Sequence, residues 1–244
     1  MPITPRTVYN TIAVNILDTL FPLRCLACDL RGAYLCAHCL KHFPIRLNQR
    51  CPTCHKATTP HGEVCFACTN QNYLDGLFAG SIYRHPLVTQ SIHTYKYRFI
   101  PGLAEPLGKW LGERILATHL PLPDIFIPVP LHKRRLRFRG FNQSALLAET
   151  LASTLALETL VPVVSNVLLR ARSTKPQIKT ESRQERQQNL KNAFTLTVGS
   201  EASIQGKIIW LIDDVATTGT TLEECASVLK KAGATSVFGI VVAR

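Results

Sequence analysis

The stretch LIDDVATTGTT, residues 211–221, decides how this sequence is interpreted. It completes an apolar run, KIIWLID, of the kind expected for a central strand of a parallel sheet. Two adjacent carboxylates, Asp213 and Asp214, stand where that strand should end, and an amphipathic stretch, TLEECASVLKKAG, follows. Open α/β sheets bind ligands at the carboxyl ends of their strands, and a helix N-terminus favours an anion. The stretch therefore predicts an anion site with two carboxylates beside it.

The loop after the acids suits a phosphate group. Gly219 lets the backbone approach a ligand closely, and hydroxyl donors surround it at Thr217, Thr218, Thr220 and Thr221. The two acids repel a phosphate, so they suit hydroxyl donors or a metal a few ångströms away. A phosphate beside a vicinal diol describes a ribose 5-phosphate, which is the ligand that this stretch indicates.

The rest of the sequence from residue 73 alternates between strand-like and helix-like segments. This alternation predicts an α/β fold with a mostly parallel sheet and helices on both faces. Strands are expected at 77–83, 124–130, 163–171, 207–213 and 235–243, and helices at 86–98, 103–120, 142–157 and 221–233. The polar segment 173–192 is expected to be a long loop or flap. Cys225 lies on one face of its helix with Leu222 and Leu229, which predicts core packing.

Eight of the nine cysteines form four Cys-x-x-Cys pairs: Cys25/Cys28, Cys36/Cys39, Cys51/Cys54 and Cys65/Cys68. Two such pairs complete a tetrahedral Cys₄ zinc site without an open position, so we expect two structural zinc ions. Disulfides or redox use are the weaker alternative in a reducing compartment. Pairing between neighbours closes the shortest loops, and a crossed pairing is the alternative. Nearby histidines (His38, His42, His55 and His61) are expected to be bystanders. Replacing Cys51 is expected to destabilise only the N-terminal segment.

The sequence is strongly basic, with a formal net charge of +12. Residues 133–191 hold twelve Lys and Arg against four acids, which indicates an anionic partner such as a phosphorylated molecule or nucleic acid. A solvated basic face is the alternative. No apolar run approaches the roughly 20 residues of a membrane span. The start of the chain reads as a short amphipathic helix and lacks a signal-peptide pattern, so we expect a cytoplasmic protein.

Residues 211–221 resemble the motif that binds 5-phosphoribosyl-1-pyrophosphate (PRPP) in type I phosphoribosyltransferases. Nearly the whole chain resembles the ComF (ComFC/GntX-like) family of competence proteins, through the cysteine segment and three further stretches. These stretches are YRHPLVTQSIHTYKY, IPVPLHKRRLRFRGFNQS and STKPQIKTESRQERQQNLKNAF. The resemblance implies an N-terminal helix and double zinc ribbon at residues 1–72 and a phosphoribosyltransferase-like domain at 73–244.

The resemblance also implies roles for individual residues. Asp213 and Asp214 would hold the ribose hydroxyls of PRPP. The 5-phosphate would lie in the loop formed by Val215, Ala216, Thr217, Thr218, Gly219, Thr220 and Thr221. The loop after IPVP would bind pyrophosphate through His132, Lys133, Arg134, Arg135 and Arg139. A flap with Gln177, Arg183, Arg186 and Asn189 would close over the ligand, and magnesium would accompany PRPP. Asn142 and Gln143 would otherwise cap a helix, Arg186 would be a surface charge, and Lys96 a solvated helix residue.

Three functions follow from these patterns. The first is a protein of DNA uptake that binds PRPP with magnesium and single-stranded DNA, together with other DNA-uptake or recombination proteins as partners. Phe138 lies among five cations and would either stack on a base or pack in the core. The second is a phosphoribosyltransferase with an unidentified acceptor, since the sequence holds a donor motif and no recognisable acceptor pocket. The third, a purely structural zinc-ribbon protein, is disfavoured by the phosphate loop.

Overall fold

The computed structural model describes residues 22–156, 161–172 and 192–244 of the 244-residue chain. The chain divides into two compact units, Met1–Phe43 and Pro44–Arg244. The first cysteine group belongs to the first unit, and the second cysteine group shares its unit with the sheet. The boundary at residue 72 stays a prediction from the sequence. The helix expected near the start of the chain lies outside the described residues.

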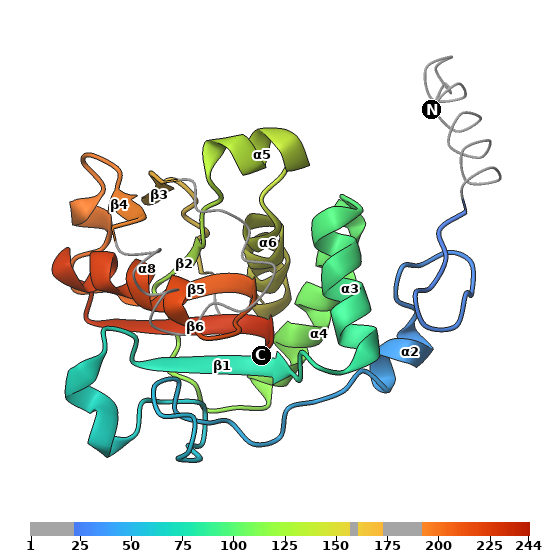
Figure 1. Cartoon of the computed structure of the whole chain (residues 1–244), viewed down its shortest axis with the longest axis horizontal. Coiled ribbons are helices and arrows are strands. Elements are labelled where there is room, and N and C mark those ends of the chain that lie inside the picture. The colour runs from blue at the N-terminus through green and yellow to red at the C-terminus, as the bar shows by residue number, and fades with distance from the viewer. Residues whose placement is uncertain (1–21, 157–160, 173–191) are drawn as a thin grey trace. The chain divides into compact units, whose positions relative to one another are not determined.

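A four-stranded parallel sheet forms the centre of the second unit (Figure 1). Its order is β1-β6-β5-β2, and each neighbouring pair runs parallel. The strands are β1 (Gly76–Ser81), β2 (Ile125–Pro128), β5 (Ile208–Val215) and β6 (Ser236–Ala243). Leu211 of β5 stands opposite Ile127 of β2 and Gly239 of β6. The predicted α/β fold with a mostly parallel sheet is confirmed.

Helices cover both faces of this sheet. They are α3 (Pro86–Tyr97), α4 (Ala104–Leu116), α6 (Gln143–Leu155) and α8 (Thr220–Lys231), with the shorter α2 (Ala37–Lys41), α5 (Lys133–Arg139), η1 (Phe66–Gln71), η2 (Pro101–Leu103) and η3 (Glu201–Ser203) elsewhere. Pro106 lies in the first turn of α4, where a missing N–H is tolerated. Within the described residues, no helix combines the length and apolar character needed to cross a membrane.

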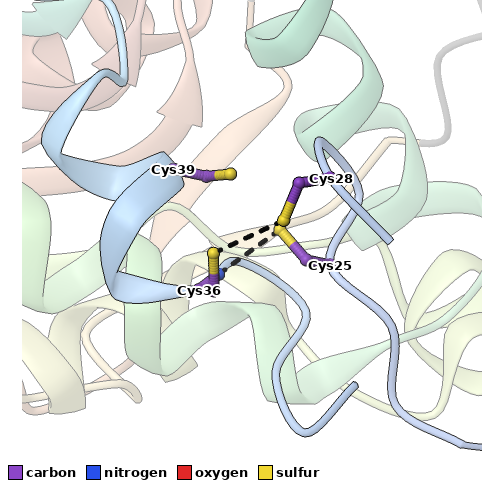
Figure 2. A group of neighbouring side chains, drawn as sticks. All are labelled: Cys25, Cys28, Cys36 and Cys39. Carbon is purple, nitrogen blue, oxygen red and sulfur yellow. Dashed lines mark hydrogen bonds between the residues drawn. The ribbon is translucent and has the colours of Figure 1, made fainter. Parts of the chain in front are cut away.

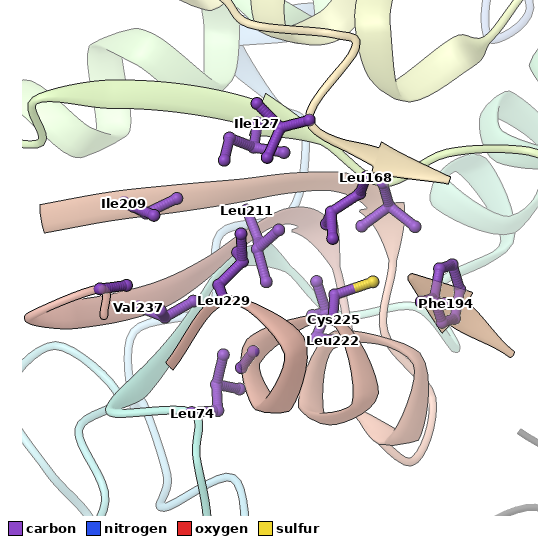
Figure 3. Packing of buried hydrophobic residues seen from close by; sticks show 14 of the residues in the cluster. Leu74, Ile127, Leu168, Phe194, Ile209, Leu211, Leu222, Cys225, Leu229 and Val237 are labelled. Atoms are coloured by element: carbon purple, nitrogen blue, oxygen red, sulfur yellow. The ribbon is translucent and has the colours of Figure 1, made fainter. Parts of the chain in front are cut away.

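Helix α8 packs its apolar residues against one face of the sheet (Figure 3). Leu222, Cys225 and Leu229 are buried there against Ile209 and Leu211 of β5. Burial raises the pKa of the Cys225 thiol well above its ordinary value, which keeps the thiol neutral at physiological pH. The predicted core role of Cys225 is therefore confirmed.

The opposite face is closed by large aromatic residues. Phe126 of β2 stacks on the buried Trp210 of β5, with ring centroids 5.5 Å apart. Trp110 of α4 packs so close to β1 that a Cβ at Gly80 would lie 2.7 Å from its ring. Both tryptophans of the chain are thus buried in the second unit, and their fluorescence reports on that unit.

Two elements differ from the sequence prediction. The segment expected as one strand at 163–171 forms a single bridge, Val163 with Phe126, and then the short strand β3 (Leu168–Arg170). Strand β3 pairs antiparallel with β4 (Phe194–Leu196), outside the main sheet. The stretch after β2 was expected to be a loop, and it forms helix α5 instead. The imidazole of His132 caps this helix by accepting from the N–H of Arg134.

The segment that carries the second cysteine group covers the edge strand β1. Gln49 is buried and makes two bonds to the backbone of Ala79, donating to its carbonyl at 3.0 Å and accepting from its N–H at 3.2 Å. Arg46 donates its N–H to the carbonyl of Gly80, and Leu77 donates to Gly62. These bonds occupy groups that an uncovered edge would expose. These bonds predict that a change at Cys51 also reaches the sheet, in contrast to the expectation from the sequence that it destabilises only the N-terminal segment.

Candidate functional site

The candidate site lies at the carboxyl end of the sheet, where β5 ends in Asp213, Asp214 and Val215. Because side chains alternate along a strand, the two neighbouring acids leave β5 in different directions. Asp214 is 1% exposed, whereas Asp213 is only half-buried. The two carboxylates therefore have different environments, although the sequence motif predicts the same role for both.

Lys96 at the end of α3 forms an ion pair with Asp214, with Nζ 2.9 Å from Oδ1. The same Oδ1 accepts from the N–H of Val215 at 2.9 Å. Burial alone would lower the pKa of Lys96, but the charges of Asp214 and Asp213 raise it, so the ammonium stays charged. The alternative of a solvated Lys96 is therefore wrong. Sequence offered no signal for this pair, since the two residues are 118 positions apart.

The second oxygen of Asp214 is buried without a hydrogen-bond partner in the described structure. A buried carboxylate oxygen without a hydrogen bond destabilises the folded state, because nothing compensates the free energy of its desolvation. Asp214 lines a pocket together with Asp213 and Lys96. A hydroxyl donor that reached this oxygen from the pocket would supply the missing bond.

Asp213 is held by the first turn of α6. Its Oδ1 accepts from the hydroxyl of Ser144 at 2.9 Å and from the N–H of Asp214 at 2.9 Å. Burial and the neighbouring Asp214 charge raise the pKa of Asp213 to about 7, against the lowering effect of Lys96. Near neutral pH this carboxyl thus gains charge as the pH rises, and a bound cation would favour its ionised form. Ser144 is a site residue that the sequence did not reveal.

The threonine loop leads directly into the N-terminus of α8. Gly219 is the residue before the helix and has φ +80°, which favours glycine at this position. The hydroxyls of Thr218 and Thr220 are hydrogen-bonded to each other at 2.9 Å. Val215 and Thr221 line the same pocket as the two acids, and Ala216 is buried behind them. Thr218, Gly219 and Thr220 line a second, smaller pocket instead, together with Asn72 and Glu223. Only the two ends of the predicted phosphate loop therefore border the pocket of the acids, at the start of a 12-residue helix.

The pocket has a volume of about 220 Å³ and a strongly polar wall. Arg135 and Arg139 of α5 and Arg170 of β3 contribute three guanidinium groups, and Lys96 and Tyr97 belong to the same wall. Burial lowers the pKa of both Arg139 and Arg170, yet an arginine stays protonated at any physiological pH. Arg170, the last residue of β3, is a pocket residue that the sequence analysis missed.

The residues expected to bind pyrophosphate divide into two groups. Arg135 and Arg139 line the pocket, and Arg139 donates a hydrogen bond to the side chain of Gln143. His132 caps α5, while Lys133 and Arg134 are exposed on it and are not among the lining residues. The expected flap residues, Gln177, Arg183, Arg186 and Asn189, lie outside the described residues.

The residues that begin α6 have separate roles. Asn142 caps the helix by accepting from the N–H of Ser144, as one alternative proposed. Gln143 does not cap the helix through its side chain, but its backbone carbonyl accepts from the hydroxyl of the buried Tyr95 at 2.7 Å. Burial, and then the charge of Asp214, raise the pKa of Tyr95, so its phenol stays a donor. The start of α6 is therefore fixed to α3 behind the pocket.

The cysteines gather into two groups of four. Within each group the sulfur atoms all lie within 4.8 Å of one another, and the groups are Cys25, Cys28, Cys36, Cys39 and Cys51, Cys54, Cys65, Cys68. Figure 2 shows how the first four side chains converge. The predicted pairing of neighbours is confirmed, and the crossed pairing is excluded. Among the described residues no histidine joins either group.

Sulfur separations test whether these groups fit zinc. A zinc–sulfur bond of about 2.3 Å in a tetrahedron places sulfur atoms roughly 3.8 Å apart. The Sγ atoms of Cys28 and Cys36 are 3.7 Å apart, and those of Cys54 and Cys65 are 3.9 Å apart. Disulfide-bonded sulfurs would be about 2.05 Å apart. Both groups therefore have the geometry of structural zinc sites.

The purified protein should carry about two zinc ions per chain, because two closed tetrahedra of thiolates bind zinc tightly. Elemental analysis of protein prepared in reducing buffer without chelators measures this directly. A value near zero would contradict the zinc interpretation, and a value near one would leave only one group as a zinc site.

Comparison with known proteins agrees with both parts of this structure. Residues 16–71 match the family model of the double zinc ribbon domain, and residues 142–244 match that of the phosphoribosyl transferase domain. A DNA utilization protein, YhgH of Salmonella typhi, is 34% identical over 211 residues, which cover 83% of this chain and 87% of that protein.

Two further proteins are similar to the chain. Competence protein F of Haemophilus influenzae is 32% identical over 225 residues, covering 87% of this chain and 93% of that protein. Among solved structures, glutamine PRPP amidotransferase of Bacillus subtilis with ADP and GMP aligns with 62% of this chain and 30% of that chain. Its TM-score of 0.40 and 20% identity are too low to carry an argument. The identities to the first two proteins, over most of each chain, show that this chain belongs to the ComF family of competence and DNA-utilization proteins.

Proposed function

We propose that this protein acts in DNA uptake or utilisation by binding PRPP with magnesium at the carboxyl end of its sheet, and by binding single-stranded DNA on its basic surface. The observation that carries the proposal is the juxtaposition at the pocket: two acids from the end of β5, Val215 and Thr221 at the two ends of the phosphate loop, and three arginines. One ligand that needs all three features is a ribose with a phosphate at each end. The names of the relatives supply the DNA context.

Each part of PRPP has a matching group in this pocket or next to it. The 5-phosphate would accept hydrogen bonds from the loop at Thr217–Thr221, where the helix dipole adds a favourable term. The ribose hydroxyls would donate to Asp213 and to the unsatisfied oxygen of Asp214. The pyrophosphate would lie against Arg135, Arg139 and Arg170, since guanidinium groups bind phosphate oxygens in a bidentate manner.

Magnesium fits the donor set of the pocket. Mg²⁺ prefers oxygen ligands and usually binds through one or two carboxylates together with substrate phosphates. Asp213 lines the pocket and is half-buried, so it is the carboxylate best placed for this, while Asp214 is engaged by Lys96. When bound, the ion would neutralise part of the pyrophosphate charge.

Phosphoribosyl transfer is the second candidate function. The same arginines that would bind pyrophosphate would also stabilise it as it leaves the ribose, so the donor half of that reaction is present. The described residues do not identify an acceptor. Pyrophosphate release that depends on one particular acceptor would establish the transferase, and PRPP binding without release would favour a binding or regulatory site.

Replacing Asp214 with asparagine is expected to weaken PRPP binding about tenfold to hundredfold. A hydrogen bond to a charged group contributes roughly 1.5–3 kcal/mol, and the amide accepts less well than the carboxylate. Isothermal calorimetry with PRPP and magnesium measures the loss, and tryptophan fluorescence checks that the variant is folded.

Inorganic phosphate is the matched ligand control for this variant, because it would occupy the loop without touching the acids. Its affinity should stay the same in Asp214→Asn, while ribose 5-phosphate and PRPP both bind more weakly. Unchanged PRPP affinity in a folded variant would show that the ribose is not held at Asp214.

A further inference from the structure

An aromatic surface lies beside the pocket at the end of α3 and on α5. Tyr97, Phe99 and Phe138 expose 61%, 37% and 78% of their surface. The rings of Phe99 and Phe138 meet edge to face, with centroids 5.3 Å apart and planes at 82°. This contact joins the segment after α3 to α5, which lie near each other in Figure 1. We call these three side chains the aromatic ledge.

The aromatic ledge is energetically unfavourable in the free protein, and a bound ligand would offset this. Helix α5 has seven residues and buries none of them, so little packing within the protein stabilises it. Phe138 of this helix is nevertheless apolar and mostly exposed, which excludes the core role considered for it. Phe99 has φ +54°, a left-handed conformation that is unfavourable for a bulky residue. Exposed aromatic clusters and backbone strain of this kind concentrate at binding sites.

The two segments that carry the ledge have charges of one sign. Arg98 at the end of α3 and three residues of α5, Lys133, Arg134 and Arg137, are all exposed. Neither residues 86–103 nor residues 131–140 contain an Asp or Glu. A partner for this surface therefore needs both negative charge and flat apolar groups. Single-stranded nucleic acid combines phosphates with unpaired bases, and proteins bind it through cations and stacked aromatic rings.

We propose that the aromatic ledge is the stacking platform for single-stranded DNA, with Phe138 as its principal ring. This inference rests on the proposed DNA-binding function and adds the site and the mode of recognition. Tyr97 belongs both to the ledge and to the wall of the PRPP pocket, and the adjacent Lys96 pairs with Asp214. A strand on the ledge therefore passes the mouth of the pocket, so the two ligands meet at the end of α3.

Replacing Phe138 tests the stacking mode. Stacking on one aromatic side chain typically contributes enough to change affinity about 5- to 150-fold. We expect Phe138→Leu to weaken binding of an oligothymidylate by this factor and Phe138→Trp to preserve it, because only the latter keeps a ring. Phe66→Leu is the matched control, since Phe66 is a fully exposed ring in η1, away from the ledge; it should bind like wild type.

Salt dependence separates stacking from the electrostatic attraction of phosphates. Phe138→Leu should keep the wild-type slope of log affinity against log salt, whereas Arg134→Ala with Arg137→Ala should flatten it by about 0.7 for each phosphate that is no longer neutralised. An oligothymidylate with one 2-aminopurine should lose fluorescence on binding wild type and lose less with Phe138→Leu. Neither arginine is among the residues that line the pocket, so PRPP affinity should be unchanged in the double variant.

The outcomes are distinguishable. If wild type does not bind the oligonucleotide at low salt, both the DNA part of the proposed function and the ledge are wrong. Wild-type binding that Phe138→Leu leaves unchanged would keep the function and overturn the ledge. If the protein bound anionic vesicles through Phe138 and did not bind DNA, the surface would belong to a membrane contact. That result would also overturn the ledge as a DNA platform.

Discussion

Replacing Cys51 with serine is expected to lower the unfolding temperature of the sheet unit by more than about 10 °C. A structural zinc contributes on the order of 10 kcal/mol of binding free energy, and each kcal/mol moves the midpoint of a domain of this size by about 2–4 °C. Loss of even half of this contribution gives such a shift. The effect reaches the sheet because the segment around Cys51 is bonded to β1 through Gln49, Arg46 and Gly62.

The C-terminal residue strengthens this link. Arg244 follows β6 and donates from its guanidinium to the carbonyls of Arg50 and Pro52, and it also contacts the ring of His55. Pro52 and His55 directly flank the ligands Cys51 and Cys54. The zinc group is thus connected to the end of a central strand as well as to the edge of the sheet.

Cys25→Ser is the matched control, since it removes one thiolate from the first zinc group in the other compact unit. Both variants should hold about one zinc ion fewer. Thermal unfolding followed by tryptophan fluorescence reports on the second unit alone, because Trp110 and Trp210 are both buried there. Cys25→Ser should leave that transition in place. Equal shifts in the two variants, or no shift in Cys51→Ser, would contradict the proposed coupling.

Replacing Lys96 with methionine is expected to destabilise the protein by about 3 kcal/mol and to weaken PRPP binding. Removing one partner of a buried ion pair leaves the other charge uncompensated, which costs roughly 3–5 kcal/mol; the side chain of Lys96 is 18% exposed, so the lower end applies. Without the ammonium, Oδ1 of Asp214 would keep only the N–H of Val215 as a partner, so its second oxygen would be held less firmly for the ribose.

Lys109→Met is the control for this change. Lys109 pairs with Glu105 on the same unit, but both side chains are more than half exposed, so no measurable destabilisation is expected. Chemical denaturation compares the two variants, and calorimetry compares their PRPP affinities. If Lys96→Met bound PRPP more tightly than wild type, Lys96 would be a competitor of the ligand for Asp214 and not its support.

The sequence predicted the main architecture because the relevant signals are local. The apolar run of β5, the acids at its end and the Gly219 turn follow one another within a few residues, so their geometry follows from strand and helix rules alone. Cysteine spacing likewise predicted the four knuckles, since each brings its own two thiolates together, and the folded chain shows which knuckles share a group.

The parts that sequence did not predict depend on contacts between distant segments. Lys96 meets Asp214 only because α3 and β5 are neighbours in the folded chain, and Ser144 reaches Asp213 in the same way. Helix α5 was missed because a basic stretch with two apolar residues has no amphipathic period for a core. The spacing of the cysteines does not predict that the Cys51 segment is hydrogen-bonded to the edge of β1.

A crystal structure of the protein soaked with PRPP and magnesium tests the central claim most directly. We expect the 5-phosphate at the loop Thr217–Thr221, the ribose hydroxyls within hydrogen-bond distance of Asp213 and Asp214, and the pyrophosphate against Arg135, Arg139 and Arg170. PRPP bound elsewhere on the protein, or an empty pocket at a PRPP concentration that saturates binding in solution, would contradict the account.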